Sequence, residues 1–253
     1  GSVTPVARLL PVNIGGVVVS NATLHNFDEI KKKDIREGDA VIVERAGDVI
    51  PHVIEVIDLK NSKRSYKYKK PKECPICGSK IIIDPDEVVI RCSGTYVCEA
   101  QIIGRLKHFV SRSALDIEGL GEKQINLFYS NGFIKKYSDI YNLENMKSKL
   151  CNLEGWGELS FSNLIKAIND KKKFSLSKLI YSLGIRFVGE KNSIAISEAF
   201  TSIYDFSKIL DNLKSESARI KYSMIEIDGL GPKAIDSFFE YLDYDENRIE
   251  VLR

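Results

Sequence analysis

Cys74-Pro75-Ile76-Cys77-Gly78 opens a run of cysteines in which 14 residues separate Cys77 from Cys92 and 5 separate Cys92 from Cys98. Two pairs of closely spaced cysteines joined by about a dozen residues are typical of a tetrahedral zinc site with four thiolate ligands. A redox Cys-x-x-Cys motif or a disulfide is the alternative, but either one needs only a single pair. Four thiolates leave no open coordination position, so the pattern predicts one structural zinc ion.

The residues between the two cysteine pairs predict a β-hairpin. Apolar runs at residues 81–83 and 88–90 flank a turn sequence at residues 84–87, and such a hairpin would return Cys92 to the first pair. Gly78 is expected to take a positive φ in the turn between Cys77 and the first strand. A segment of about 30 residues has too small a core to fold without the metal.

Four turns of similar sequence follow the cysteines. Their last glycines lie 36, 32 and 42 residues apart, and a helical pattern follows each turn. This period fits two helices and their turns, so it indicates an internal repeat of the helix-hairpin-helix type. The turns are Ile117-Glu118-Gly119-Leu120-Gly121, Leu153-Glu154-Gly155-Trp156-Gly157, Ile185-Arg186-Phe187-Val188-Gly189 and Ile227-Asp228-Gly229-Leu230-Gly231, and the helical patterns are residues 124–129, 160–168, 193–200 and 234–242.

The glycines of these turns predict contacts with phosphate. A glycine lets another backbone approach closely, and the helix after it begins with unpartnered N–H groups and the positive end of the helix dipole. A DNA phosphate satisfies both without reading the base sequence; helix capping and packing are the alternative roles of these glycines. The predicted DNA-binding residues of the turns are Gly119, Gly121, Lys123, Gly155, Gly157, Gly189, Lys191, Gly229, Gly231 and Lys233.

The four turns differ in two ways that bear on this prediction. A lysine stands two residues after the last glycine in the first, third and fourth turns, whereas the second turn has Leu159 there. We therefore expect a weaker phosphate contact at the second turn. The third turn has Phe187 in place of its first glycine, which leaves a different turn geometry open.

Trp156 and Cys151 are expected to pack inside the helical part.

Residues 1–70 predict a small all-β domain. The β-forming runs are residues 17–20, 40–45 and 49–57. Residues 24–33 predict one helix with Asn26 as its N-cap. Strands, a short helix and further strands favour a small Greek-key barrel of the OB type, with any other small β-barrel or sandwich as the alternative. Pro51 within the third run requires an edge strand or a bulge.

Two basic features of this domain point to DNA. Arg45 ends a strand before a turn that contains Asp48, so it is predicted either to contact DNA or to pair with that aspartate. Residues 60–72 hold seven basic residues and no acidic one, which indicates a solvated connector or a segment that steers the DNA backbone. Tyr66 and Tyr68 are spaced to share one face of a strand there.

The composition is that of an ordinary globular protein. The chain has 253 residues, of which 43% are hydrophobic and 28% charged, and a net charge of +2. Any grip on nucleic acid must therefore come from local patches and backbone amides. No apolar run is long enough to span a membrane, and without a visible secretion signal we expect a reducing compartment, which favours zinc over disulfides. We interpret Gly1-Ser2 as a cloning remnant at the start of a fragment of a longer protein.

Several stretches resemble the bacterial NAD-dependent DNA ligases. They include Thr4-Pro5-Val6-Ala7, Asp34-Ile35-Arg36-Glu37-Gly38-Asp39, Leu183-Gly184-Ile185-Arg186-Phe187-Val188-Gly189 and the four-cysteine motif. The resemblance covers nearly the whole chain and keeps the family's order of domains. It implies a multidomain fold with a small all-β OB barrel at residues 1–70, a four-cysteine zinc finger at residues 71–103 and an all-α helix-hairpin-helix domain at residues 104–253.

Members of this family seal nicks in duplex DNA in replication and repair, and they use NAD to adenylylate the lysine of a Lys-x-Asp-Gly motif. The chain lacks that motif; its nearest string, Glu226-Ile227-Asp228-Gly229, has glutamate at the lysine position. The resemblance therefore implies the DNA-gripping part of a ligase without its adenylation and BRCT domains, with no catalytic residue and no activity alone. NAD and Mg²⁺ are implied for the full-length enzyme and not for this part.

The resemblance also implies partners. They are nicked double-stranded DNA and the adenylation domain upstream in the same chain, with no membrane, and we expect a monomer in the bacterial cytoplasm at the nucleoid. Two other functions stay open: a non-catalytic DNA-repair module that binds through zinc finger and hairpins, and a helical scaffold for other proteins. A Lys-x-Asp-Gly motif upstream would favour the ligase, and DNA affinity that survives bulky substitutions at Gly121 and Gly231 would favour the scaffold.

Overall fold

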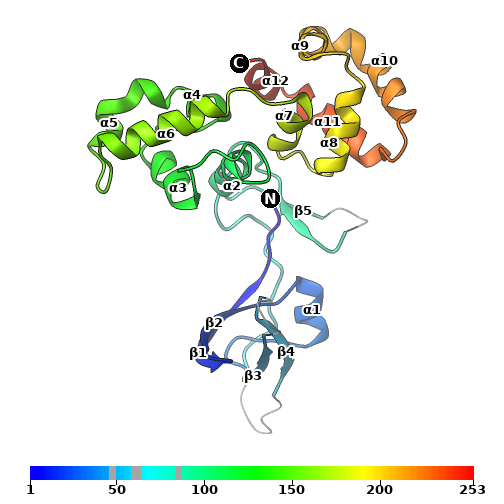
Figure 1. The fold of residues 1–253 in the computed structure, drawn as a ribbon. Coiled ribbons are helices and arrows are strands. Elements are labelled where there is room, and N and C mark those ends of the chain that lie inside the picture. Colours follow the sequence, from blue (N-terminus) through cyan, green and yellow to red (C-terminus); the bar gives the residue numbers. More distant parts are fainter. Residues whose placement is uncertain (46–49, 58–63, 84–86) are drawn as a thin grey trace. The chain divides into compact units, whose positions relative to one another are not determined.

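The computed structural model describes residues 1–45, 50–57, 64–83 and 87–253 (Figure 1). The chain forms two compact units, Gly1–Gln101 and Ile102–Arg253. Asp48, the basic residues Lys60 and Lys63, and residues 84–86 of the predicted turn lie outside the described residues, and the predictions made for them stay predictions. None of the described helices has both the length and the apolar character that crossing a bilayer would require.

The first unit begins with a four-stranded sheet in the order β1-β2-β4-β3. The strands β1 and β2 pair antiparallel, as do β3 and β4, while β2 and β4 meet in parallel at Thr23 and His52. A short helix, α1, lies between β2 and β3 in the sequence, which is the mixture of elements that the sequence predicted for an OB fold. The bounds are β1 (Val6–Ile14), β2 (Val17–Thr23), α1 (Phe27–Lys32), β3 (Val41–Glu44) and β4 (His52–Val56).

Two proline positions explain where the strand predictions were wrong. The strand β1 was not predicted, and it contains Pro11 beside a register shift between Arg8 and Val12. Such a bulge tolerates the missing backbone N–H of proline. Pro51 lies before β4 rather than inside it, and its carbonyl accepts a hydrogen bond from the Thr23 N–H at 2.7 Å. The prolines thus mark an irregular strand and a strand boundary.

The helix α1 confirms the predicted cap but starts later than predicted. The side chain of Asn26 accepts a hydrogen bond from the Glu29 N–H at 2.9 Å, so the helix begins at Phe27 and not at residue 24. Phe27 and Ile30 are its buried residues. The ring of Tyr68 stacks on Phe27 with the ring centroids 6.1 Å apart, which places the basic connector against this helix.

An ion-pair network attaches the basic connector to the sheet unit. Arg64 lies 2.8 Å from an Asp34 oxygen and 2.7 Å from an Asp39 oxygen, and Arg36 lies 2.8 Å from Asp34. The Asp39 side chain is only 5% exposed. No described residue from 64 to 71 is in a strand, so the prediction that Tyr66 and Tyr68 share one face of a strand is wrong. Arg64 therefore forms ion pairs within the protein.

This network predicts a pH-dependent stability. A hydrogen bond from Arg36 lowers the pKa of Asp34 below its ordinary value of 3.8, and a hydrogen bond from Arg64 does the same for Asp39. Because the folded pKa values are depressed, the pairing stabilises the fold above about pH 4 and is lost as the pH falls through the folded values. In urea unfolding, Asp39→Asn should lower the midpoint at pH 7 and converge with the unaltered chain below pH 3.8.

Asp28→Asn is the matched control, because Asp28 forms one exposed ion pair, with Lys70 at 2.8 Å. We expect little change in the midpoint at either pH, since exposed pairs contribute little. An equal loss at pH 7 for the two variants would contradict a special role for the Asp39 pair.

The predicted hairpin is present, but its second strand lies at residues 90–92 and not at the predicted residues 88–90. It consists of β5 (Ile81–Ile83) and β6 (Ile90–Cys92), paired antiparallel with Ile81 opposite Cys92. The first residues of the chain join it: the Val3 N–H donates to the Ile90 carbonyl at 2.9 Å, and the Cys92 N–H donates to the Gly1 carbonyl at 2.8 Å. Gly1, which the sequence analysis left out of the fold, is therefore part of it.

All regular elements of the second unit are helices, and the first of them, α2, begins three residues before this unit, at Glu99. This unit confirms the helix predicted after each of the four turns, and each begins one residue after the last glycine of its turn. The helices are α2 (Glu99–Val110), α3 (Glu122–Ser130), α4 (Tyr137–Tyr141), α5 (Lys147–Cys151), α6 (Glu158–Asp170), α7 (Leu176–Ser182), α8 (Glu190–Glu198), α9 (Ile203–Asp211), α10 (Leu213–Ile225), α11 (Pro232–Asp243) and α12 (Asp245–Leu252), with a 3-10 turn, η1, at Leu143–Met146.

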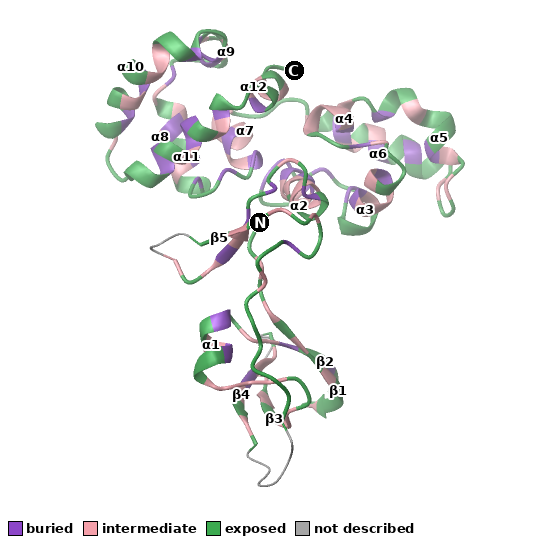
Figure 2. Cartoon of the chain, turned by 180° about the vertical axis from the view of Figure 1, so that it is seen from behind, coloured by how far each residue is buried: buried purple, intermediate pink, exposed green. Residues whose placement is uncertain are grey.

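Two apolar cores hold these helices, and Figure 2 shows their buried residues along the helices. One core gathers residues of α2, α3 and α6 around Phe128, and the other gathers residues of α7 to α11 around Phe238. Tyr137 packs against both cores, and its hydroxyl donates to the Leu183 carbonyl at 3.0 Å. Shared contacts of this kind make the hairpin array one packed body.

His108 has a structural role that the sequence did not predict. Its Nε2 lies 2.8 Å from the Tyr181 carbonyl oxygen. Gly184, with φ +64, faces the same ring, and a Cβ there would come within 3.1 Å of it. The histidine therefore fixes α2 against the end of α7.

Candidate metal centre and nucleic-acid interface

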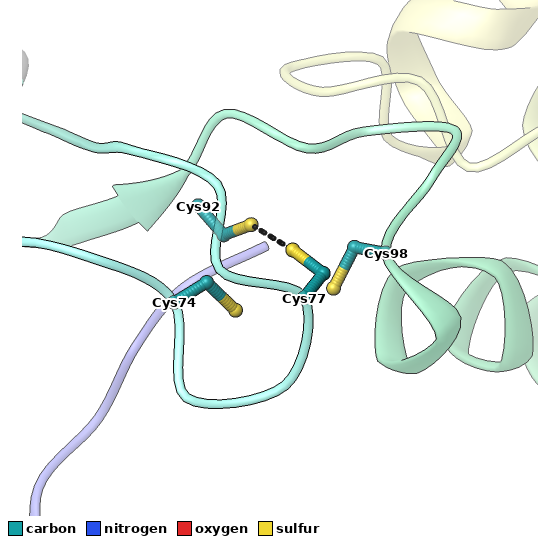
Figure 3. Close-up of side chains that lie close together, drawn as sticks. All are labelled: Cys74, Cys77, Cys92 and Cys98. Carbon is teal, nitrogen blue, oxygen red and sulfur yellow. Dashed lines mark hydrogen bonds between the residues drawn. The ribbon is translucent and has the colours of Figure 1, made fainter.

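The four predicted metal ligands converge on one point. The sulfurs of Cys74, Cys77, Cys92 and Cys98 all lie within 4.8 Å of one another, and the Cys77 and Cys92 sulfurs are 3.4 Å apart (Figure 3). Cys92 comes from the end of β6 and Cys98 immediately precedes α2. Gly78 has the predicted positive φ of +71, which turns the chain between the first pair and β5.

The cluster fits a zinc ion. A tetrahedron with Zn–S bonds of about 2.3 Å has sulfur–sulfur edges of about 3.8 Å, which lies between the Cys77–Cys92 sulfur distance of 3.4 Å and the 4.8 Å within which all four sulfurs lie. Three of the four cysteines are buried and the fourth is partly buried. A closed set of four sulfur donors suits a structural metal and leaves no position for a substrate.

Ser79 and Gly94 complete the centre, and the sequence analysis missed both. The Ser79 hydroxyl lies 3.3 Å from the Cys77 sulfur, and hydrogen bonding by Ser79 lowers the pKa of Cys77 to about 6. Burial raises the pKa of Cys92, although the Gly94 N–H donates to its sulfur at 3.3 Å. A Cβ at Gly94 would lie 2.4 Å from the Ser79 oxygen and 2.9 Å from the Cys77 sulfur, so only glycine fits there.

The four predicted turns share one backbone geometry. In each, the fourth residue donates its N–H to the carbonyl of the first, at 3.3 Å (Leu120), 3.0 Å (Trp156), 3.1 Å (Val188) and 3.2 Å (Leu230). The third residue has a positive φ in every case: +84° at Gly119, +76° at Gly155, +62° at Phe187 and +79° at Gly229. A closed turn with positive φ at its third residue is of type II.

Phe187 therefore does not change the third turn. Its φ of +62° places a bulky side chain in a conformation that glycine adopts without strain and phenylalanine rarely adopts. The different geometry that the sequence left open at this position is absent.

Each turn leads directly into a helix that no side chain caps. The N-cap residues are Gly121, Gly157, Gly189 and Gly231, all with extended backbone and none with a side-chain cap. All four are exposed. Uncapped N–H groups at an exposed helix start are suited to hold an anion.

The side chains beside these helix starts are of both signs. Lys123, Lys191 and Lys233 are exposed. In the helix after the second turn, the position two residues after the last glycine is Leu159, which is 76% exposed. Three of the four helices begin with a glutamate, and the fourth begins with Pro232. These glutamates were not predicted from the sequence; their carboxylates interact favourably with the helix dipole and repel a second anion.

Lysines from neighbouring elements hold two of these glutamates. Lys107 lies 2.7 Å from Glu122, and Lys147 lies 3.0 Å from Glu158. The Lys107 ammonium lowers the pKa of Glu122 below its usual value. A phosphate that approaches either helix start would therefore meet a cation that is already close to it.

The first turn also borders a cleft of about 680 Å³. Its lining includes the turn from Ile117 to Glu122 and three basic residues, Lys107, Arg112 and Lys171. Lys171 lies 3.1 Å from Asp116, which also lines the cleft.

Arg45 is the predicted DNA contact of the sheet unit. It directly follows β3 and is partly buried. Asp48, the aspartate proposed to compete for it, lies outside the described residues.

The turn geometry predicts different costs for two neighbouring glycines. Gly155 has φ +76°, and Gly157 has an extended φ of −142°; a Cβ at either one would meet nothing within 4 Å. Gly155→Ala should therefore lower the free energy of unfolding by about 1–2 kcal/mol through backbone strain alone. Gly157→Ser should change it by less than about 0.5 kcal/mol, because serine is a good N-cap. Urea unfolding measures both, and equal losses would contradict the assigned turn.

Two families match the first part of the chain. Residues 1–65 match the NAD-dependent DNA ligase OB-fold domain, and residues 73–100 match the NAD-dependent DNA ligase C4 zinc finger domain. All four clustered cysteines lie within the second range. The fold and the metal centre thus define a multidomain protein with an OB fold, a C4 zinc finger and an all-α helix-hairpin-helix part. The chain belongs to the NAD-dependent DNA ligase family.

Curated relatives extend the likeness over the helices. A DNA ligase of Maricaulis maris (strain MCS10) is 44% identical over 260 residues, covering 98% of this chain and 37% of the relative. DNA ligases of Wolbachia pipientis wMel and Rickettsia bellii (strain RML369-C) are 42% and 41% identical, covering 98% and 100% of this chain. The chain spans 37% of the length of each of these relatives.

Proposed function

We propose that this chain is the DNA-gripping part of an NAD-dependent DNA ligase, an enzyme that seals nicks in duplex DNA in replication and repair. The observation that carries the proposal is the repeated turn: four type II turns with uncapped, exposed helix starts follow a zinc finger of this family. Each turn offers backbone N–H groups to a phosphate, and three add a lysine. A duplex backbone presents phosphates at regular spacing, so a repeated anion site suits it.

Contacts of this type predict how the chain selects DNA. Phosphate contacts fix position and carry no base sequence, so the chain would bind nicked duplexes of any sequence. Because the net charge is only +2, DNA binding would depend on local basic patches and backbone amides and not on the charge of the whole chain. Binding should weaken steeply as salt rises, because each neutralised phosphate releases counterions.

The cofactors divide between this chain and the rest of the enzyme. Cys74, Cys77, Cys92 and Cys98 would hold one zinc ion, whose role is to fold residues 71–103. NAD and Mg²⁺ would act in the upstream adenylation domain, since this chain has no Lys-x-Asp-Gly motif. The chain alone would not transfer AMP. We propose the domain bounds 1–70, 71–103 and 104–253, and a monomer at the bacterial nucleoid.

Fluorescence anisotropy with a labelled nicked duplex tests this function. We expect saturable binding at low salt, with similar affinity for two unrelated sequences and a strong decrease between 50 and 200 mM salt, as is typical of about six to ten phosphate contacts. A parallel incubation with labelled NAD should give no adenylylated chain. Absence of binding at low salt would contradict the DNA-gripping role, and an adenylylated band would contradict the assignment of catalysis to another domain.

A further inference from the structure

Phe187 is an exposed aromatic side chain at the apex of the third turn. It is 40% exposed and holds a φ of +62°, at the position where the other three turns have glycine. Its neighbours Ile185 and Val188 are buried in the helical core, but Phe187 is not among the residues of that core. A strained backbone that carries a ring toward solvent is a pattern of functional sites.

Arg186 and Asn192 both contact Phe187 at this apex. The guanidinium carbon of Arg186 lies 4.3 Å from the centre of the Phe187 ring, a cation–π distance. From α8, the Asn192 side-chain amide donates to the Phe187 carbonyl at 2.7 Å. The ring and the guanidinium group thus form a platform beside the helix start at Gly189.

We propose that the Arg186–Phe187 platform binds duplex DNA through the sugars and base edges of a groove, whereas the other three turns contact phosphate only. The inference rests on the proposed function. Apolar side chains that enter the minor groove and insert at a base step are a known means of holding a duplex, and a ring beside a guanidinium combines an apolar contact with a cation. Glycine turns leave no side chain at the apex that could do this.

The variant Phe187→Asn tests the platform, because asparagine accepts a positive φ better than most residues. Affinity for a labelled nicked duplex should fall between about 5-fold and 150-fold, as expected for the loss of an aromatic contact with DNA. The slope of log affinity against log salt should stay unchanged, because no phosphate contact is lost. Phe187→Tyr should keep the affinity, since it keeps the ring.

Two control variants distinguish a contact made by the Phe187 ring from a contact made by a nearby charge and from the effect of removing any exposed aromatic ring. Lys191→Ala, in the same turn, should lower the salt slope by about 0.9 as one phosphate contact is lost. Tyr222→Ala removes a ring that is 70% exposed on α10 and should leave affinity unchanged. Thermal melting of each variant checks that it is folded.

The outcomes distinguish this inference from the proposed function. If the unaltered chain binds and Phe187→Asn binds equally well, the platform has no role in binding and only this inference is overturned. If Phe187→Asn reduces the salt slope as Lys191→Ala does, the contact is electrostatic and the inference is overturned as well. Failure of the unaltered chain to bind at low salt overturns both.

Discussion

Cys98→Ser should leave the chain without zinc and with an unfolded segment from about residue 72 to residue 100. Cys98 is 1% exposed, and its N–H donates to the Gly94 carbonyl at 2.7 Å as the chain enters α2. Zinc binding to small four-ligand modules supplies on the order of 10 kcal/mol at neutral pH, and in such modules binding and folding are one event. Only a short hairpin and few buried residues remain to hold the segment when the metal is absent.

Native mass spectrometry and circular dichroism measure the two effects. The unaltered chain should carry one zinc ion, and chelation should reproduce the spectrum of Cys98→Ser. Cys151→Ser is the matched control: Cys151 is partly buried against the helical core, and its loss should leave the zinc in place. A metal-free chain with an intact segment would contradict the metal centre.

Replacing Lys123, Lys191 and Lys233 together with alanine should weaken binding of a nicked duplex by on the order of a hundredfold at physiological salt. Each lysine stands two residues after the last glycine of its turn and is exposed, where its ammonium can join a phosphate held by the helix start. The salt slope should fall by about 0.9 for each lysine removed. Fluorescence anisotropy at several salt concentrations gives both values.

A matched triple variant removes the same charge elsewhere. Lys166, Lys208 and Lys214 are also exposed but stand away from the four turns in the sequence. Their joint replacement should change affinity much less and keep most of the slope. Equal losses from the two triple variants would mean that net charge, and not the turns, holds the DNA.

The metal centre and the repeat could be predicted because their chemistry is local. Cysteine spacing alone places four sulfurs that the structure brings within 4.8 Å of one another. The glycine turns could be predicted for the same reason, since a positive φ at the third residue requires a particular residue type. Asn26 likewise capped α1 as its sequence position indicated.

The features that could not be predicted depend on contacts between distant residues. Gly94 is required because Ser79 and Cys77 lie next to it in space, and no spacing rule relates them. The pairing of Arg64 with Asp34 and Asp39 joins residues 30 and 25 positions apart. Phe187 has a positive φ although phenylalanine rarely adopts one. Here the surrounding helix-hairpin-helix structure determines the turn, and not the conformational preference of the residue.

In the proposed function, the exposed helix starts of the four turns hold phosphates of duplex DNA. Amide NMR of the whole chain, titrated with a nicked duplex, tests this most directly. The amide signals of Gly121, Gly157, Gly189 and Gly231 should shift together as the duplex binds and return as salt is added, with Gly157 shifting least because its turn has Leu159. Saturating binding that leaves these four amides unchanged would contradict the claim.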